Sequence, residues 1–195
     1  VGPIIRAIRE VLFRLPDPVT RIAECGEEEL RSRCSGFVYR FFRAEHLASL
    51  LIAVNRLLRS YGTLQEALHG AGGEEELQPA VGRLIEELKE AAPGDTSILL
   101  SNPTGGSASK RVHLYLRWMV RCDQVDPGGW SFFDPAQLLV PVDTHMLRIA
   151  REMGITRRSR ADLRTAVDVT DFFRRIEPTD PVRYDFVLTR FGIRP

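Results

Sequence analysis

The chain has 195 residues, the usual length of one domain, and 44% of them are hydrophobic, which is enough to fill a sizeable core. Its formal net charge of +1 excludes both a strongly basic nucleic-acid-binding tail and an acidic disordered chain. No apolar run approaches the ~20 residues that a membrane helix needs. Three cysteines, Cys25, Cys34 and Cys122, are too few for a disulfide scaffold. We therefore expect a cytoplasmic protein with reduced thiols and no membrane segment.

The N-terminal part of the chain predicts two amphipathic helices. The first carries an apolar side chain at helical spacing from Ile5 onward and ends at Pro16. Residues 37–42 alternate weakly and are compatible with a short strand or with a helical turn. The second helix covers residues 44–61, has leucine and valine on one face, and ends at Gly62.

The middle of the chain predicts two further helices and a long loop. Thr63 is the expected N-cap of a short helix, with Glu66 as the reciprocal partner of a capping box. A longer helix follows over residues 75–92. The stretch 92–109 is rich in proline, glycine, serine and threonine, which indicates a loop.

The second half predicts helices over residues 110–122, 143–152, 160–176 and 181–192, with an irregular segment at 125–138. No segment has convincing strand alternation, so the predicted fold class is all-α. We expect one domain over residues 1–195, made of two helical lobes that divide near 93–109 with a cleft between them.

Charge is divided unevenly along the chain. Residues 1–100 hold 12 basic and 15 acidic side chains (12 − 15 = −3), and residues 101–195 hold 15 and 11 (15 − 11 = +4). Two groups concentrate the positive charge: Lys110, Arg111, Arg117 and Arg121, and then Arg148, Arg151, Arg157, Arg158, Arg160 and Arg164. A basic binding face and an ordinary solvated helix surface are both compatible with this pattern.

A glycine-rich turn, Asn102-Pro-Thr-Gly-Gly-Ser-Ala-Ser, leads into a helix that opens with Lys110. Such a turn exposes backbone N–H groups next to the positive end of the helix dipole, which suits a phosphate. The dipole disfavours a cation at this position and so favours the neutral amine that can attack carbon. The alternative is a solvated, charged lysine beside the turn. Only Lys89 and Lys110 among the 27 basic residues are lysines, and arginine cannot supply a neutral amine.

Asp143 has two roles that do not exclude each other. It follows the apolar Leu139-Val-Pro-Val and precedes a predicted helix, so it is a natural N-cap. The hydrogen bonds of a cap would also keep the carboxylate ionised, which is the state needed to stabilise a cationic transition state.

These segments resemble the helix–hairpin–helix base-excision DNA glycosylases, and the wider pattern resembles an uncharacterised bacterial family related to them. The resemblance covers nearly the whole chain. Its motifs are Gly36-Phe-Val-Tyr-Arg-Phe, Tyr61-Gly-Thr-Leu, Gly106-Ser-Ala-Ser-Lys-Arg, Leu116-Arg-Trp-Met-Val-Arg, Pro141-Val-Asp-Thr-His and Asp180-Pro-Val-Arg-Tyr-Asp-Phe.

The resemblance implies a helix–hairpin–helix element and a monomeric enzyme that acts on double-stranded DNA containing a damaged base, without a metal or cofactor. It makes Lys110 the attacking amine and Asp143 the essential carboxylate, while the backbone of Gly105, Gly106 and Ser107 grips a DNA phosphate. Lys110 and Asp143 lie 33 positions apart (143 − 110), a wide spacing that is similar to the archaeal 8-oxoguanine glycosylase branch. We therefore expect an oxidised purine as the substrate.

Two departures from the related enzymes are visible. No cysteine follows Cys122, so the C-terminal iron–sulfur cluster of some relatives is not expected. The related bacterial family has more helical sequence before the point where this chain starts, so we expect that an N-terminal part of one lobe is either missing or supplied differently.

Two further residues are candidates for contact with DNA. Arg111 belongs to the basic group that opens the predicted helix. His145 follows Asp143 and is a candidate for contact with a phosphate or a flipped nucleotide; a surface histidine with only local bonds is the alternative.

The base pocket has three candidates. Trp130, in a Gly-Pro loop, can stack on a base, whereas Trp118 is expected to pack within a core helix. Tyr184 and Asp185 occupy a segment that relatives use beside the base. Asp185 would recognise an N–H edge of a purine, and a buried helix–helix hydrogen bond is the alternative.

Three hypotheses follow for function. The first is a DNA glycosylase with lyase activity that forms a Schiff base through Lys110. The second is a helix–hairpin–helix module that binds DNA without catalysis, and the third is a helical adaptor that binds protein.

Overall fold

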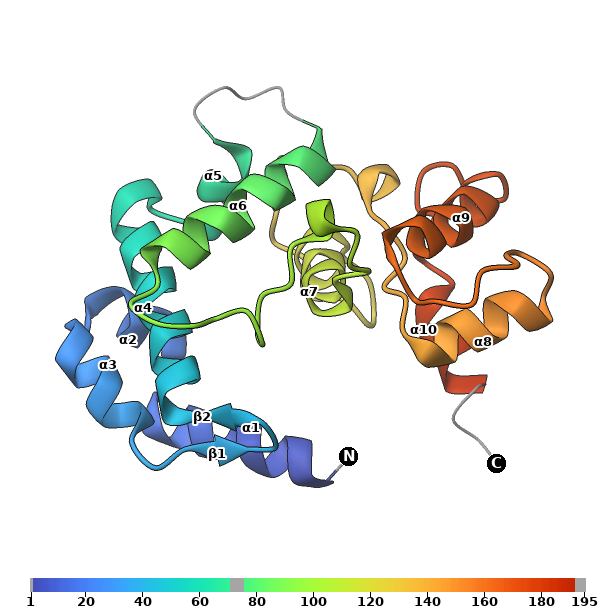
Figure 1. Cartoon of the computed structure of the whole chain (residues 1–195). Helices are drawn as coiled ribbons and strands as arrows, with labels where there is room; N and C mark the ends of the chain where they lie inside the picture. Colours follow the sequence, from blue (N-terminus) through green and yellow to red (C-terminus); the bar gives the residue numbers. More distant parts are fainter. Residues whose placement is uncertain (1, 71–75, 192–195) are drawn as a thin grey trace. The chain divides into compact units, whose positions relative to one another are not determined.

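The computed structural model describes residues 2–70 and 76–191, and these are mostly helical, which confirms the predicted all-α class (Figure 1). The chain forms two compact units. Unit 1 comprises Val1–Ala71 and Arg83–Leu100, and unit 2 comprises Gly72–Gly82 and Ser101–Pro195. The cleft expected between two lobes stays a prediction.

Unit 1 is built around α4 (Ala44–Tyr61), which contacts α2 (Pro18–Glu24), α3 (Glu27–Cys34) and α5 (Leu64–His69). The N-terminal helix α1 (Gly2–Arg14) contacts α3. The buried core consists of Leu15, Cys25, Leu30, Cys34, Ala48, Leu51 and Ile52. Buried Asn55 of α4 donates from Nδ2 to the carbonyl oxygens of Ile22, Ala23 and Cys25, which ties the end of α2 to α4.

The ambiguous residues 37–42 form part of a hairpin rather than a helical turn. Strands β1 (Val38–Tyr39) and β2 (Phe42–Arg43) are antiparallel, with Tyr39 opposite Phe42. The two rings stack with centroids 6.3 Å apart, and Arg40 in the turn has a φ of 53°. The cross-strand aromatic pair thus accompanies a tight turn that a helix would not tolerate.

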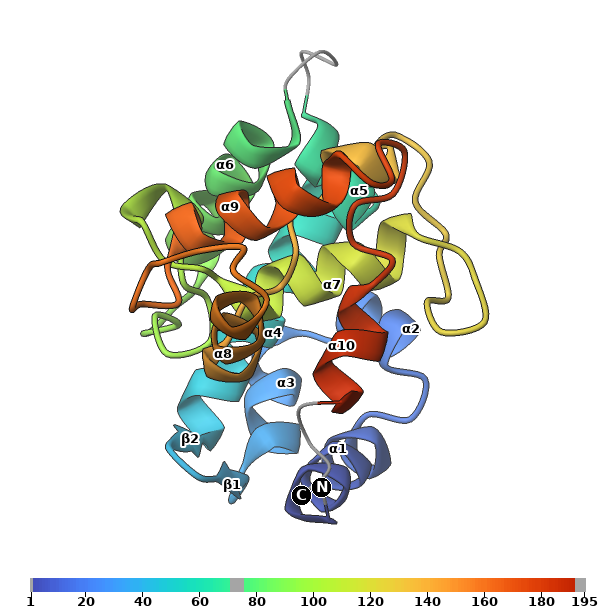
Figure 2. The ribbon, with the colours of Figure 1, turned by 90° about the vertical axis from the view of Figure 1, so that its right-hand side faces the viewer.

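Unit 2 contains α7 (Lys110–Val120), α8 (Thr144–Glu152), α9 (Leu163–Arg174) and α10 (Asp185–Phe191). Helices α8 and α10 contact each other, and α9 lies above both in Figures 1 and 2. Asp143 caps α8 and Asp162 caps α9 through hydrogen bonds to backbone amides. The short 3₁₀ helix η2 (Pro135–Gln137) interrupts the segment that was expected to be irregular.

The turn before α7 contains a short helical segment. Helix α6 (Leu77–Ala91) ends well before α7, and the helical turn immediately before Gly106 is the 3₁₀ helix η1 (Pro103–Gly105). Gly106 has a φ of 85°, and its carbonyl accepts from Leu163 N at 3.0 Å. A 3₁₀ turn bonded to the start of α9 therefore precedes α7, and the helix–hairpin–helix element stays a prediction.

All three cysteines are free thiols; Cys25 and Cys34 are buried and Cys122 is exposed. Within residues 2–70 and 76–191, no helix combines the length and the apolar character needed to cross a membrane.

Candidate active site

Lys110 and Asp143 meet at the first turns of two helices of unit 2. Lys110 is the first residue of α7, and Asp143 is the N-cap of α8. The Nζ of Lys110 donates to Oδ2 of Asp143 at 2.5 Å, while 40% and 27% of the two side chains remain exposed. The pair that the sequence motifs single out is therefore in direct contact and open to solvent.

The two oxygens of Asp143 have separate partners. Oδ1 accepts from the backbone N–H groups of His145 and Met146, each at 2.9 Å, and Oδ2 accepts from Lys110. Burial acts to raise the pKa of Asp143, but the hydrogen bonds from Lys110 and the two amides outweigh it and lower the pKa below its usual value. Asp143 is thus an anionic carboxylate at neutral pH and a helix cap at the same time.

A cavity of about 630 Å³ opens beside this pair, a size typical of small-molecule sites. Its lining is mostly apolar and comes from α7, the loop after α7, the start of α8, and α10. The members that matter most are Lys110, Tyr115, Trp118, Asp143, Asp185 and Phe186. An apolar cavity with an amine and two carboxylates fits a flat, partly polar ligand.

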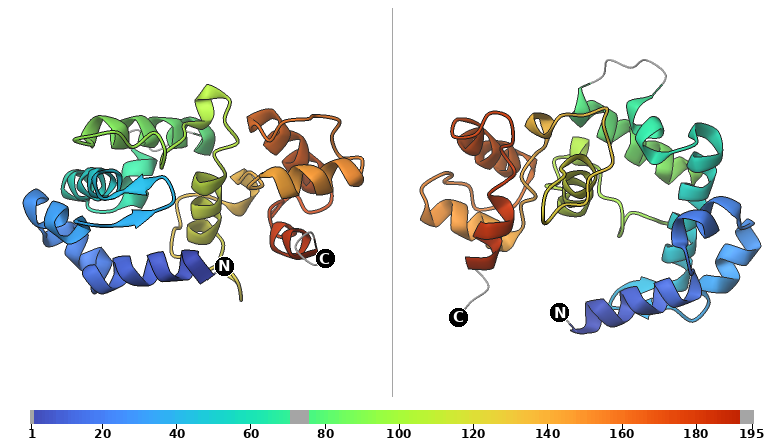
Figure 3. Two further views of the ribbon diagram at one scale, coloured as in Figure 1. Left: turned by 60° about the horizontal axis from the view of Figure 1, so that its bottom comes forward. Right: turned by 180° about the vertical axis from the view of Figure 1, so that it is seen from behind.

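The aromatic lining differs from the expectation. Trp118, which was expected to pack in a core, is 44% exposed and lines the cavity together with Tyr115. Trp130, the expected stacking residue, does not line it; its ring meets Tyr115 edge-on at 5.6 Å. The loop that carries Trp130 folds back along α7 through a bond from Trp130 N to the carbonyl of Met119 (Figure 3). Trp130 therefore supports Tyr115 from behind.

Asp185 joins a buried ion-pair network. It is 5% exposed, and its Oδ2 accepts a hydrogen bond from Arg117 Nη1 at 2.5 Å. This is a buried hydrogen bond between α10 and α7, the alternative to base recognition that the sequence left open for Asp185. Its Oδ1 is buried and has no hydrogen-bond partner among the described residues, yet Asp185 lines the cavity. Burial raises the pKa of Asp185, and the neighbouring Arg117 acts against that change. One oxygen thus has an unused acceptor position but is out of contact with solvent.

The rest of the network fixes the loop after α7. Arg117 also donates from Nε to Asp126 Oδ2 at 3.1 Å, and Arg121 donates to Asp126 and to Asp180. Asp126 is fully buried. Because Asp126 and its two arginines belong to the loop and to α7, they hold the cavity-lining loop in place.

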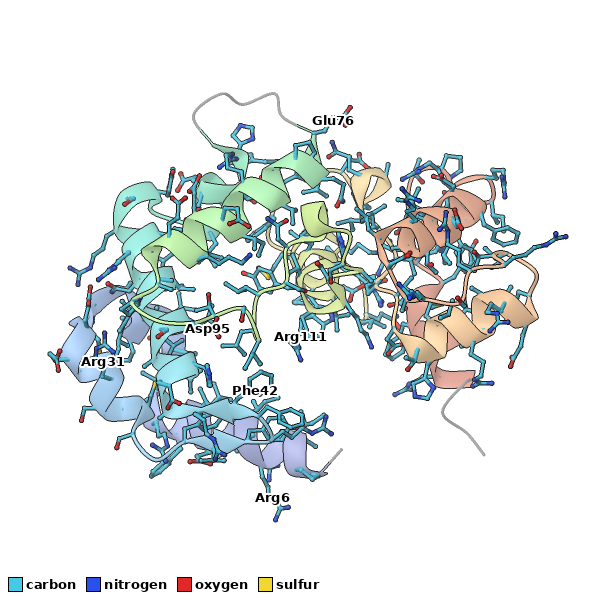
Figure 4. All side chains as sticks on the ribbon, in the orientation of Figure 1. Arg6, Arg31, Phe42, Glu76, Asp95 and Arg111 are labelled. Atoms are coloured by element: carbon cyan, nitrogen blue, oxygen red, sulfur yellow. The ribbon has the colours of Figure 1, made fainter. Side chains whose placement is uncertain are left out.

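The remaining predicted residues lie at different distances from the cavity. His145 is exposed and lines it, whereas Tyr184 does not line it and packs on Phe173 with ring centroids 5.4 Å apart. Arg111 extends from the first turn of α7 (Figure 4) and is exposed. The structure thus brings His145 to the Lys110–Asp143 pair but not Tyr184.

The glycine-rich turn uses two of its amides internally. Gly105 N donates to the carbonyl of Asn102 at 3.3 Å, and Gly106 N donates to that of Pro103 at 2.8 Å. Ser107 Oγ accepts from Ser109 N at 3.1 Å. Phosphate binding by Gly105 and Gly106 therefore stays a prediction. It would require each amide to give up its carbonyl acceptor or to share its hydrogen between that carbonyl and the phosphate.

Sequence reasoning missed Tyr115 and Arg117 as residues of this site. Counting helical positions from Lys110 would have found the exposed face, since Leu114 and Trp118 follow it at i+4 and i+8 and also line the cavity. Nothing in the sequence indicated that the buried Arg117 would pair with Asp185, which lies 68 positions away.

Comparison with known proteins gives one match. A family model described as "Protein of unknown function (DUF2400)" matches residues 1–194. No curated protein and no solved structure matches the chain.

Proposed function

The chain belongs to this DUF2400 family, whose description assigns no activity, and from its site we propose a DNA glycosylase with lyase activity that excises an oxidised purine, 8-oxoguanine first. One observation carries the proposal: an amine and a carboxylate in contact at 2.5 Å beside a cavity of about 630 Å³. Arginine in place of Lys110 could not form a Schiff base.

Substrate binding follows from the lining of the cavity. The glycosidic carbon is unreachable inside a stacked duplex, so the damaged nucleotide rotates out and its base enters the cavity. The rings of Tyr115 and Trp118 offer stacking surface worth ~1–3 kcal/mol per base. Asp185 lines the same cavity, and its buried Oδ1, which has no hydrogen-bond partner among the described residues, would accept from an N–H edge of the purine after the side chain turns toward the base.

The chemistry starts with a proton transfer. A proton passes from Lys110 Nζ along the hydrogen bond to Oδ2 of Asp143 and on to the departing base, and because the pKa of Asp143 is lowered, its carboxyl gives this proton up readily and returns to the carboxylate. The neutral Nζ forms a bond to C1′ while the bond from C1′ to the base nitrogen breaks, with its electron pair leaving on the base. The Asp143 carboxylate stabilises the positive charge that develops on the sugar.

The covalent intermediate then permits strand cleavage. The sugar ring opens to give a protonated Schiff base between Nζ and C1′. Loss of a proton from C2′ expels the 3′ phosphate by β-elimination, and water hydrolyses the imine to restore Lys110. The phosphate leaves with the electron pair of its C–O bond, so no oxidant or reductant is needed.

Borohydride trapping tests this proposal directly. The chain is incubated with duplexes that carry 8-oxoguanine or an abasic site, and reduction of the Schiff base should give a covalent complex. Lys110→Gln should abolish trapping. Lys89→Gln is the matched control, because Lys89 is the second lysine of the chain and forms an ion pair with Glu86 on α6.

The outcomes separate the hypotheses. Absence of a Lys110-dependent complex while duplex binding persists would leave the DNA-binding module without catalysis. Absence of duplex binding as well would favour the helical adaptor that binds protein.

A further inference from the structure

Unit 2 carries a second hollow, of about 560 Å³, that the proposed reaction does not use. We call it the α8 hollow; it is lined by Thr144, Arg148, Arg151, Glu152, Thr156 and Arg157, among others. Three guanidinium groups thus share a small concave surface with one carboxylate.

The positive charge of the α8 hollow is only partly neutralised. Arg148 pairs with Glu152 at 3.0 Å, and both side chains are more than half exposed. Arg151 and Arg157 are exposed, and no carboxylate of the described residues lies within ion-pair distance of either. Like charges placed together without a counterion are unfavourable, so this arrangement fits an anionic ligand.

The turn after α8 fixes the position of Arg157. Gly154 has a φ of 70°, and Ile155 N donates to the carbonyl of Ala150 at 2.8 Å, which closes the helix end. Thr156 is buried and donates to Asp168 Oδ2 at 2.9 Å.

The nearby carboxylate of Asp168 is already engaged. Arg158 Nε donates to the same Oδ2 of Asp168 at 2.9 Å. Asp168 therefore pairs with Arg158, and Arg157, which lines the hollow, forms no ion pair among the described residues.

The spacing along α8 matches a phosphodiester backbone. Thr144, Arg148 and Arg151 stand at i, i+4 and i+7, so they share one face over about 10 Å of helix. One strand of a duplex presents a phosphate per ~3.4 Å of helix axis, and guanidinium groups bind phosphates through paired hydrogen bonds. Because the strand also winds around that axis, this face is long enough to contact at least two consecutive phosphates.

The first turn of α8 also connects the hollow to the site. Asp143 and His145 line the active-site cavity, and Thr144 between them lines the α8 hollow. We propose that the α8 hollow binds consecutive backbone phosphates of the DNA next to the flipped nucleotide. The inference rests on the proposed function only in taking duplex DNA as the partner.

Salt-dependent binding tests the α8 hollow. Affinities for a labelled undamaged duplex and for one with a stable abasic analogue are measured by fluorescence anisotropy between about 50 and 200 mM salt. Arg151→Gln and Arg157→Gln should each reduce the slope of log K against log [salt] by about 1 and weaken binding to both duplexes equally. Arg157→Lys should retain the slope because it keeps the charge.

Arg6→Gln is the matched control. Arg6 is an exposed arginine that projects from α1 in unit 1 (Figure 4), and its substitution should leave the slope unchanged. Wild-type slopes for Arg151→Gln and Arg157→Gln would overturn the proposal, as would failure of the wild-type chain to bind either duplex.

The two proposals fail in different ways. If Lys110 is still trapped but Arg151→Gln and Arg157→Gln keep the wild-type slope, only the proposal that the α8 hollow binds phosphates is rejected. Reduced slopes without any trapped complex would support the hollow and remove the lyase chemistry alone.

Discussion

At the scale of single residues, Asp143 combines two functions because each of its oxygens serves one of them. Oδ1 holds the first-turn amides of α8, and Oδ2 faces Lys110. The cap fixes the carboxylate in one orientation, so the oxygen that faces the amine needs no rearrangement before reaction.

Asp143→Asn should therefore separate stability from activity. Asparagine is an equally good N-cap, and the Lys110–Asp143 pair is partly exposed, so the free energy of unfolding should change by less than about 1 kcal/mol. The trapping rate should fall by roughly 10²-fold or more, because the negative charge and the proton acceptor are lost. Thermal melting and single-turnover trapping measure the two effects, and an unchanged rate would contradict the assigned role.

His113 predicts a pH dependence of stability. It is 1% exposed on α7, both ring nitrogens have no hydrogen-bond partner among the described residues, and burial lowers its pKa to about 4. The unfolded chain has a histidine pKa near 6.5 and binds the proton more readily, so stability is fully present above about pH 6.5 and is lost as the pH falls toward 4. The loss has a ceiling of about 3 kcal/mol.

His113→Leu should remove this contribution. In urea unfolding between about pH 4 and 7, the wild type should lose stability relative to His113→Leu as the pH falls. The exposed His145, substituted by Gln, is the control and should follow the wild type. Parallel curves for wild type and His113→Leu would exclude His113 as the source.

Residue chemistry was predictable where a local motif contained it. The cap at Asp143 and the lysine at the start of α7 follow from their neighbours in sequence. The Arg117–Asp185 pair does not, because it depends on the packing of α7 against α10 and because fully buried arginines are rare. The exchange of roles between Trp118 and Trp130 likewise depends on how the loop folds back along α7.

At the scale of elements, apolar periodicity predicted the long helices and failed for short charged ones. Helix α4 begins and ends where the pattern did. Helix α3 has three glutamates in its first turn and only two buried residues. Helix α2 has no buried residue, so neither helix shows an apolar stripe. Proline at the N-terminus of α2 and the acidic first turn of α3 are the cues that would have found them.

The loop between α7 and η2 depends on Asp126. This carboxylate is fully buried between Arg117 and Arg121, so Asp126→Asn would weaken two buried hydrogen bonds, while Asp185 and Asp180 still neutralise the two arginines. The free energy of unfolding should fall by about 1–3 kcal/mol, because buried polar partners lose their charged acceptor. Asp123→Asn is the control. The Asp123 side chain, which pairs with Arg121, is 41% exposed, so the free energy of unfolding should fall by less than about 1 kcal/mol.

Urea unfolding at neutral pH distinguishes these variants. Equal losses for Asp126→Asn and Asp123→Asn would mean that the buried network contributes no more than a surface ion pair. A large loss for Asp126→Asn alone would identify the network as the element that holds the cavity-lining loop.

At the scale of the whole molecule, α6 belongs to both units. Its first part, Leu77–Gly82, belongs to unit 2, and the residues from Arg83 to its end at Ala91 belong to unit 1. Its buried side chains continue across the boundary: Leu77, Ala80, Val81, Leu84, Ile85 and Leu88. Because a continuous helix supplies core residues to each unit, neither unit can unfold completely without exposing part of α6.

We therefore expect the chain to unfold in a single cooperative transition. Ile52→Ala in unit 1 and Val169→Ala in unit 2 each truncate a fully buried side chain, and the isoleucine substitution should cost about 2–5 kcal/mol, the smaller valine truncation somewhat less. Each variant should lower the single melting temperature rather than produce two transitions, because loss of either core removes support from α6. Calorimetry that resolved a second transition in either variant would show that α6 does not couple the two units.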